Sequence, residues 1–460
     1  MHDLQTLLDE GYKDAGLNEL RLACPLEEFP KQIFELGGTL QILDLSGTGL
    51  SSLPADFGLS LPRLKEAVFA KCNFTTFPSE LASCSSLENV DFSNNGMTEI
   101  PEEALPPRVC RLILTNNRLA YLPSSTGLCP NLRVCLCTGN QLRKLPSQMA
   151  NCKSLSVLRL SSNRLRTVPD WVFTLPELAF FSFAGNPCVT PLTNGNTGAY
   201  SKVIASTDVE IHSTLHSSPS CTVSRALWHQ TENFAEDIAV KIFRQPLTDN
   251  GTIDEEVAAL CMAGAHESLI TGLGHLEGHP DTEAVPAGLV MQLVSEAYRP
   301  LNQYVPSGAQ PQLQEESATG LTPLSTMKML FGLAGALSHL HKRGILHGDV
   351  VLENILASRE DEHALLTNFR AATRFGKATD MKYRLESIEA LAFGQLIDQM
   401  IRLLGGGDFG QEGNRLKRVL VDLCTRCMTR AVRSRPTFAE IEEEIEATVG
   451  WRAMMRVPGA

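Results

Sequence analysis

An apolar pattern with a period close to 23 residues runs through the first 190 positions of the chain. The template LxxLxLxxNxLxxLP recurs there, and successive units begin 22 to 24 residues apart. The first apolar positions of the units are Leu17, Leu40, Leu64, Leu87, Val109, Leu132, Leu155 and Leu178. Each unit offers one short alternating stretch, which buries its apolar face only against neighbouring units. The pattern therefore predicts a solenoid with one short strand per unit.

One polar position recurs inside this apolar frame. It is filled by Asn95, Asn117, Asn140, Asn163 and Asn186, and by Thr48 and Cys72 in earlier units. We expect the asparagine side chains to satisfy main-chain groups where the chain turns away from each strand. Eight such units resemble the leucine-rich repeat family. The resemblance implies an α/β leucine-rich-repeat solenoid, which we place at residues 1–189.

In such a solenoid, function lies on the concave face that the strands form. The outward strand positions of the later units are apolar: Ile113, Val134, Leu136, Val157 and Phe180. A clustered, exposed apolar patch is typical of a protein-binding site. The β-propensity of a strand, or cover by the second half of the chain, would explain the same residues. We expect a protein partner on this face, and the sequence does not name it.

Composition changes beyond the repeats. Residues 190–206 are rich in Gly, Asn, Thr and Ser and show no periodicity, which predicts a linker. We assign residues 207–450 to a second domain and residues 451–460 to a C-terminal tail. Within the second domain, we expect residues 273–288 to form a solvated loop between two strands.

The second domain carries short motifs in an order that resembles the protein kinase family over roughly 240 residues. Residues 239–243 read AVKIF, like the VAIK motif, and residues 435–438 read RPTF. His347-Gly348-Asp349, followed by Asn354, matches HRDxxxxN. Each motif alone is weak, but their order and spacing are specific. The resemblance implies an α+β bilobal protein kinase-like domain that binds ATP and Mg²⁺.

The resemblance also implies roles for individual residues. Lys241 would pair with nucleotide phosphates and with Glu256, for which Glu255 is the fallback. Asp349 would accept the proton of the substrate hydroxyl. Asn354 and Asn368 would occupy the two metal-binding positions.

The adenine side of the implied pocket involves two further segments. Residues 288–294 read GLVMQLV and resemble a strand that runs into the hinge between the lobes. Met291 would be the gatekeeper, and main-chain groups of Gln292 to Val294 would meet adenine. Val223 would cover the base from the strand after the glycine loop.

Several expected groups are missing. The three glycines of GxGxxG are replaced by His216, Ser218 and Cys221, whose side chains hinder the approach of main-chain N–H groups to phosphate. The DFG position reads Asn368-Phe369-Arg370, so a neutral amide replaces the carboxylate that balances magnesium. Val351 occupies the position of the catalytic-loop lysine. Because phosphoryl transfer depends on positioning and charge, these changes predict a severe loss of transfer.

Other parts of the kinase frame are kept or shortened. Gly348 replaces the arginine that clamps a phosphorylated activation loop, and only a short segment without APE separates Asn368 from Glu386. Glu389 can substitute for the aspartate that supports the catalytic loop from beneath. Phe369 and His347 fit the hydrophobic column between the lobes.

Bulk properties narrow the surroundings of the protein. The formal net charge of -12 and a pI near 5.5 argue against nucleic acid and anionic membrane as main partners. The first residues show no signal-peptide pattern, and no apolar stretch is long enough to span a membrane. The 13 cysteines include no pair of CxxC motifs of the kind that binds zinc, so we expect reduced thiols and a cytoplasmic location.

Four functions remain open on these grounds. The sequence favours a pseudokinase, or a very weak kinase, coupled to a partner-binding solenoid in signalling. An active Ser/Thr-type protein kinase with an atypical metal site is the first alternative. A scaffold that binds no nucleotide is the second. A small-molecule phosphotransferase also carries HGDxxxxN, but the repeats and the RPTF tail count against it.

Overall fold

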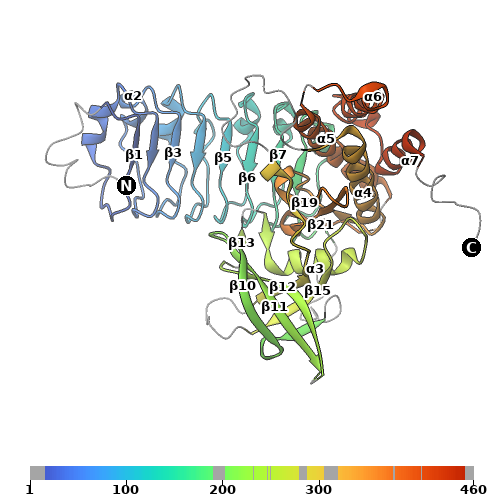
Figure 1. Cartoon of the computed structure of the whole chain (residues 1–460). Helices are drawn as coiled ribbons and strands as arrows, with labels where there is room; N and C mark the ends of the chain where they lie inside the picture. The colour runs from blue at the N-terminus through green and yellow to red at the C-terminus, as the bar shows by residue number, and fades with distance from the viewer. Residues whose placement is uncertain are drawn as a thin grey trace, which may run out of the picture. The chain divides into compact units, whose positions relative to one another are not determined.

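The computed structural model describes residues 16–189, 202–231, 233–245, 247–248, 250–278, 287–304, 320–376, 379–405 and 407–450. The chain divides into two compact units close to Cys188 (Figure 1). Most of the predicted linker, residues 190–201, lies outside the described residues, as does the predicted tail 451–460. Each unit is described below by itself.

The first unit is built on one parallel sheet of eight strands that follow one another in chain order (Figure 1). The strands are β1 (Glu19–Arg21), β2 (Ile42–Asp44), β3 (Glu66–Val68), β4 (Asn89–Asp91), β5 (Arg111–Ile113), β6 (Val134–Leu136), β7 (Val157–Arg159) and β8 (Phe180–Ser182). The middle residue of each strand is buried, as the alternating pattern predicts. One strand per sequence repeat, each paired in register with the next, is consistent with a repeat solenoid.

Short helices follow most of the strands. They are η1 (Lys31–Leu36), α2 (Phe57–Ser60), η2 (Ser79–Ser83), η3 (Ser124–Leu128), η4 (Ser147–Asn151) and η5 (Asp170–Thr174). A proline precedes each 3₁₀ helix of this set, at Pro30, Pro78, Pro123, Pro146 and Pro169. Proline suits the entry to a helix because its φ is fixed and it has no N–H group to leave unpaired.

The repeated asparagines make the predicted main-chain bonds. Asn163 Nδ2 donates to the carbonyls of Cys137 and Leu160, at 2.8 and 3.0 Å. Its Oδ1 accepts from the N–H group of Leu142 at 2.9 Å. Asn117, Asn140 and Asn186 repeat this arrangement. The prediction for these side chains is confirmed.

The second unit begins with a six-stranded sheet in the order β10-β11-β12-β16-β15-β9. Its strands are β9 (Val203–Ala205), β10 (Val209–Ser217), β11 (Cys221–Thr231), β12 (Phe234–Phe243), β15 (Gly272–Glu277) and β16 (Ala287–Gln292). The short helix η7 (Ser206–Asp208) and helix α3 (Ile253–Ala263) complete this part. The two-residue strand β13 (Leu247–Thr248) and Gly251 of strand β14 (Gly251–Thr252) group with the first unit, although they come from this stretch of the sequence.

Two expectations about this sheet need correction. Strand β9 falls inside the range predicted as linker, yet it pairs in parallel with β15, as His275 with Val203. Residues 273–288 are not one solvated loop, because β15 occupies their first part and buries Leu276 against Val240 and Val290. A Cβ at position 274 would lie 2.3 Å from the carbonyl oxygen of Lys202, so glycine permits this close strand pairing.

The remainder of the second unit is mainly helical (Figure 1). Its helices are η8 (Leu301–Tyr304), α4 (Pro323–Lys342), η9 (Leu352–Asn354), η10 (Phe369–Ala371), α5 (Thr379–Leu404), α6 (Gly410–Cys427), η11 (Val432–Ser434) and α7 (Phe438–Val449). Its short strands are β17 (Arg299–Pro300), β18 (Ile345–Leu346), β19 (Ile355–Ser358), β20 (His363–Leu366) and β21 (Thr373–Arg374). Among the described residues, no helix combines the length and the apolar character needed to cross a membrane.

The RPTF sequence ties this helical part together. Arg435 is buried, and its guanidinium donates to the carbonyls of Thr429 and Ser387 at 3.0 Å each. Thr437 caps α7, where it forms a reciprocal capping box with Glu440. The residues of this motif are therefore structural in this protein.

Candidate functional site

A buried ion pair joins the sheet to helix α3. Lys241 comes from the middle of β12, and its ammonium group contacts Glu256 of α3. Their side chains are 7% and 3% exposed. The first turn of α3 carries three acidic residues, whose negative charges are stabilised by the positive end of the helix dipole. The structure thus pairs Lys241 with the glutamate preferred from the sequence.

The fallback residue Glu255 has a different partner. Arg374 of β21 lies with its Nη2 3.4 Å from Glu255 Oε2, and its Nη1 lies 3.5 Å from Met262 Sδ. Both side chains are buried, so the pair fixes α3 against the segment that follows Asn368. Sequence reasoning missed Arg374, although an arginine inside the short apolar stretch after Phe369 was a signal.

The loop that carries Asp349 is supported from beneath. Gly348 adopts a positive φ of 77°, and its N–H group donates to Glu389 Oε1 at 2.7 Å. Glu389 Oε2 lies 2.7 Å from His341 Nε2, and both side chains are buried. His347 packs its ring edge on Phe369 with a centroid distance of 5.1 Å. Glu389 therefore supports the loop as expected from the sequence.

Three predicted site residues form a hydrogen-bonded chain. Asn354 Nδ2 donates to Asp349 Oδ2 at 3.0 Å, and Asn368 Nδ2 donates to Asn354 Oδ1 at 2.8 Å. Asn368 has a left-handed backbone with φ of 62°, which asparagine adopts more readily than most residues. Within the described residues, its buried Oδ1 accepts no hydrogen bond.

This donor set does not fit magnesium. Mg²⁺ is usually held by one or two carboxylates together with phosphate oxygens and water. Here the two expected ligand positions carry neutral amides, and each amide is engaged with its neighbour. The described residues contain no group of three or more His, Cys, Asp or Glu side chains that could hold a metal ion. At these two positions, Asn368 Oδ1 is the one amide oxygen that accepts no hydrogen bond within the described residues and could still ligate a metal ion.

The turn between β10 and β11 takes the place of a glycine loop. The N–H group of Ser218 donates to the carbonyl of Cys221 at 2.9 Å, and the N–H group of Cys221 donates to Ser218 Oγ at 3.2 Å. A glycine loop offers such N–H groups to phosphate. In this protein, both are committed to bonds within the turn.

Arg370 faces this turn from the segment after Asn368. It lies in η10, and its Nη2 is 3.9 Å from Cys221 Sγ. The positively charged guanidinium of Arg370 therefore reaches from the segment after Asn368 to the turn that replaces the glycine loop. Sequence analysis noted Arg370 only as the last residue of the altered DFG motif and gave it no role.

Val223 and Met291, two of the residues predicted to contact the nucleotide base, lie on the two strands that flank β12. Val223 of β11 is paired with Lys241, and Met291 of β16 is paired with Ala239. Beyond β16, the main-chain N–H and C=O groups of Leu293 and Val294 make no hydrogen bond within the described residues. Main-chain groups of this kind can bind a purine edge, which is the role that the kinase resemblance implies for this segment.

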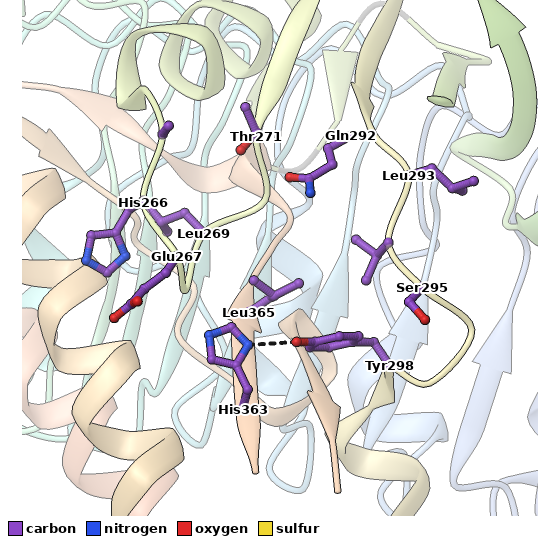
Figure 2. A pocket seen from close by; sticks show the side chains of 12 residues that line it. His266, Glu267, Leu269, Thr271, Gln292, Leu293, Ser295, Tyr298, His363 and Leu365 are labelled. Atoms are coloured by element: carbon purple, nitrogen blue, oxygen red, sulfur yellow. Dashed lines mark hydrogen bonds between the residues drawn. The ribbon is translucent and has the colours of Figure 1, made fainter. Parts of the chain in front are cut away.

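A groove lies beside the segment that follows β16. Figure 2 shows this groove, which has a volume of about 690 Å³ and which we call the hinge groove. It is lined by residues 265–267, 269, 271, 292–295, 298, 363 and 365. Gln292 and Val294 are shared with the predicted base site, whereas Lys241, Asp349, Asn354 and Asn368 are absent from the lining. The hinge groove is therefore distinct from the phosphate side of the predicted site.

Polar side chains in the hinge groove are mostly held in place. Tyr298 Oη lies 2.8 Å from His363 Nδ1 (Figure 2). Outside the lining, Ser268 Oγ lies 3.2 Å from His363 Nε2. Burial lowers the pKa of His266, and the nearby His339 adds to this effect. Burial also raises the pKa of Tyr298. The lowered pKa of His266 and the raised pKa of Tyr298 both favour the neutral forms of these two side chains.

The comparisons with known proteins place this geometry in a family context. Residues 209–389 match a family model described as protein tyrosine and serine/threonine kinase. The match spans Lys241, Asp349, Asn354 and Asn368 and ends at Glu389. No curated protein matches the chain. A protein-kinase-family domain is therefore present in the second unit.

Proposed function

We propose that this chain is a signalling protein in which a leucine-rich-repeat solenoid binds a protein partner and a kinase-like domain binds ATP with weak or absent phosphotransfer. The observation that carries this proposal is the hydrogen-bonded pair of Asn354 and Asn368, which stands where two metal ligands are expected. On this proposal the domain keeps nucleotide binding and loses most phosphate transfer, because transfer depends on the charge of the metal ion more than binding does.

Support for nucleotide binding comes from the parts of the frame that remain. The buried pair of Lys241 and Glu256 keeps a lysine on β12 in the position that meets nucleotide phosphates. Leu293 and Val294 offer main-chain groups that make no hydrogen bond within the described residues and could therefore meet adenine. Asp349 is held by Asn354, so the catalytic loop also keeps its shape.

Support for weak transfer comes from missing charge. Asn368 replaces the carboxylate of the metal site, and Val351 replaces a lysine that would meet the transferring phosphate. Loss of one such electrostatic group costs roughly a hundredfold to a thousandfold in rate. In addition, only positions 369–378 separate Asn368 from the start of α5, which leaves little chain to hold a protein substrate. An active Ser/Thr-type kinase is the alternative that a transfer assay separates.

Support for a protein partner comes from the strand register of the first unit. Val134, Val157 and Phe180 lie opposite one another in one row across β6, β7 and β8. Ile113 and Leu136 form a second row on the same face. All five side chains are partly exposed.

Val157→Asp should abolish binding of the partner, while the matched change Glu66→Asp on β3 preserves it. Equal binding by both variants would refute this part of the proposal.

We also place the protein in the cytosol. All 13 cysteines are free thiols, most of them buried. Burial raises the pKa of Cys84, Cys152 and Cys427 to about 12 in each case, so these thiols stay protonated. Unpaired cysteines in this number are typical of a reducing compartment.

The proposal is tested by measuring binding and transfer separately. The purified chain is titrated with ATP, with and without Mg²⁺, while its melting temperature is followed. Because a ligand that binds the folded state stabilises it, we expect a rise of the melting temperature with ATP. Absence of any shift at millimolar ATP would leave the scaffold reading. Magnesium-dependent incorporation of labelled phosphate that is lost in Asp349→Asn would establish the active kinase instead.

A further inference from the structure

Arg370 is a partly buried cation that has no anionic partner among the described residues. Its one hydrogen-bond contact among the described residues is the weak one to Cys221 Sγ, at 3.9 Å. By contrast, Arg374, four positions along the chain, is buried against the carboxylate of Glu255. Withdrawing a guanidinium from water costs free energy unless an anion faces it. The position of Arg370 therefore points to an anion that is part of the bound state.

The location of Arg370 identifies the kind of anion. The guanidinium reaches from the residue after Phe369 to the turn between β10 and β11. In protein kinases, the glycine loop covers the nucleotide phosphates, and the aspartate of DFG holds their metal ion. The turn between β10 and β11 and Asn368 stand at these two positions in this chain. Arg370 thus occupies the side of the site where phosphate groups lie when a nucleotide is bound.

Among the described residues around this site, few groups other than Arg370 can bind the negative charge of phosphate. Magnesium does not fit the amides of Asn354 and Asn368, and the turn keeps the N–H groups of Ser218 and Cys221 for itself. Lys241 is already balanced by Glu256. A guanidinium binds phosphate through two parallel hydrogen bonds and needs no metal to do so.

We propose that Arg370 binds the phosphates of the nucleotide in place of magnesium, so that the kinase-like domain binds ATP without a divalent cation. The contact with Cys221 is exchanged for phosphate oxygens when the nucleotide enters. This inference rests on the proposed function, because it assumes that the domain binds ATP. It goes further by naming the residue that carries the phosphate charge.

The test compares ATP with adenosine in the absence of metal. Binding to the full chain is measured by calorimetry and by melting temperature, in EDTA and in Mg²⁺, for the wild type and for Arg370→Ala and Arg370→Lys. Arg225→Ala is the control, because Arg225 is an exposed arginine of β11 that pairs with Asp237. Unchanged adenosine binding shows that each variant is folded with an intact base site.

We expect the wild type to bind ATP with affinities in EDTA and in Mg²⁺ that agree within about twofold. Arg370→Ala should weaken ATP binding about tenfold or more, which corresponds to one lost charge-assisted pair, and should leave adenosine binding unchanged. Arg370→Lys should fall between the two, and Arg225→Ala should match the wild type.

Three outcomes would overturn the inference while the proposed function stands. They are ATP binding that requires Mg²⁺, ATP binding by Arg370→Ala equal to that of the wild type, and tighter ATP binding by Arg370→Ala, which would make Arg370 a latch that closes the site. If the wild type binds neither ATP nor adenosine, the proposed nucleotide binding itself fails, and this inference fails with it.

Discussion

Asparagine has opposite uses in the two units of this protein. In the first unit, Asn163 is buried with its amide nitrogen donating to three carbonyls and its oxygen accepting from Leu142. In the second unit, Asn368 donates one bond to Asn354, and its buried oxygen has no partner within the described residues. The same side chain is fully satisfied where it builds the fold and incompletely satisfied where a ligand is expected.

This difference separates a structural polar residue from a residual functional one. A buried acceptor without a partner costs roughly 1–3 kcal/mol, so folding alone does not favour it. It is tolerated at Asn368, which is linked through Asn354 to Asp349. The comparison therefore predicts different responses when the two asparagines are changed.

The largest effect is expected in the first unit. Asn163→Ala removes a side chain that satisfies four main-chain groups and leaves them buried without partners. The loss should lower the free energy of unfolding by about 3 kcal/mol or more. The measurement is chemical denaturation combined with hydrogen exchange of amides in β6 to β8.

The matched control is Asn73→Ala. Asn73 is exposed, and its amide makes one bond, to the carbonyl of Gly49 at 2.9 Å. Its loss should cost less than about 1 kcal/mol. Equal destabilisation by the two substitutions would show that burial and bond count do not set the value of these asparagines.

A smaller effect, with a sign that depends on metal, is expected in the second unit. Asn368→Asp places a carboxylate oxygen against Asn354 Oδ1, so two acceptors meet where one bond existed. In EDTA this should lower stability by about 1–2 kcal/mol. Mg²⁺ with ATP should restore it, because the new carboxylate can ligate the metal. Melting temperatures in EDTA, Mg²⁺ and Mg²⁺ with ATP measure the difference.

Asn302→Asp provides the control for this experiment. Asn302 also has a buried Oδ1 without a partner in the described part of the chain, but it belongs to η8 and not to the Asp349 cluster. Its aspartate variant should show no recovery with Mg²⁺. If Asn368→Asp responds to the metal no more than Asn302→Asp does, the position of Asn368 no longer holds metal even when a carboxylate is supplied.

The parts of this structure that sequence predicts best are those set by local pattern. The repeat fixes which residue of each strand is buried and where the asparagine stands, so the bonds of Asn163 follow from its position. The pairing of Lys241 with Glu256 and the support of the Asp349 loop by Glu389 were implied by the resemblance to the protein kinase family, and the structure has both contacts.

The parts that sequence did not predict depend on side chains that meet across large separations. The contact of Arg370 with Cys221 and the pairing of Arg374 with Glu255 join segments more than a hundred residues apart, and no motif specifies them. Strand β9 was missed because its three residues follow a Gly- and Ser-rich stretch, and its pairing depends on the glycine at position 274. Short strands take their stability from their neighbours, which local composition does not show.

The smallest effect tests whether an unpartnered polar atom always marks a ligand site. The hydroxyl of Thr126 in η3 is fully buried and has no partner among the described residues, but Thr126 belongs to a repeat unit and not to the hydrogen-bonded group of Asp349, Asn354 and Asn368. Thr126→Val removes the unpaired hydroxyl and keeps the shape, so it should raise the free energy of unfolding by up to about 1 kcal/mol.

Thr48→Val is the matched control, because Thr48 is also buried but donates to the carbonyl of Leu45 at 2.8 Å. That variant should lose about 1 kcal/mol. Opposite signs in denaturation would show that Thr126 stores a cost of folding, whereas a loss in both variants would mean that Thr126 has a partner in solution and that an unpartnered atom is weaker support for the site at Asn368.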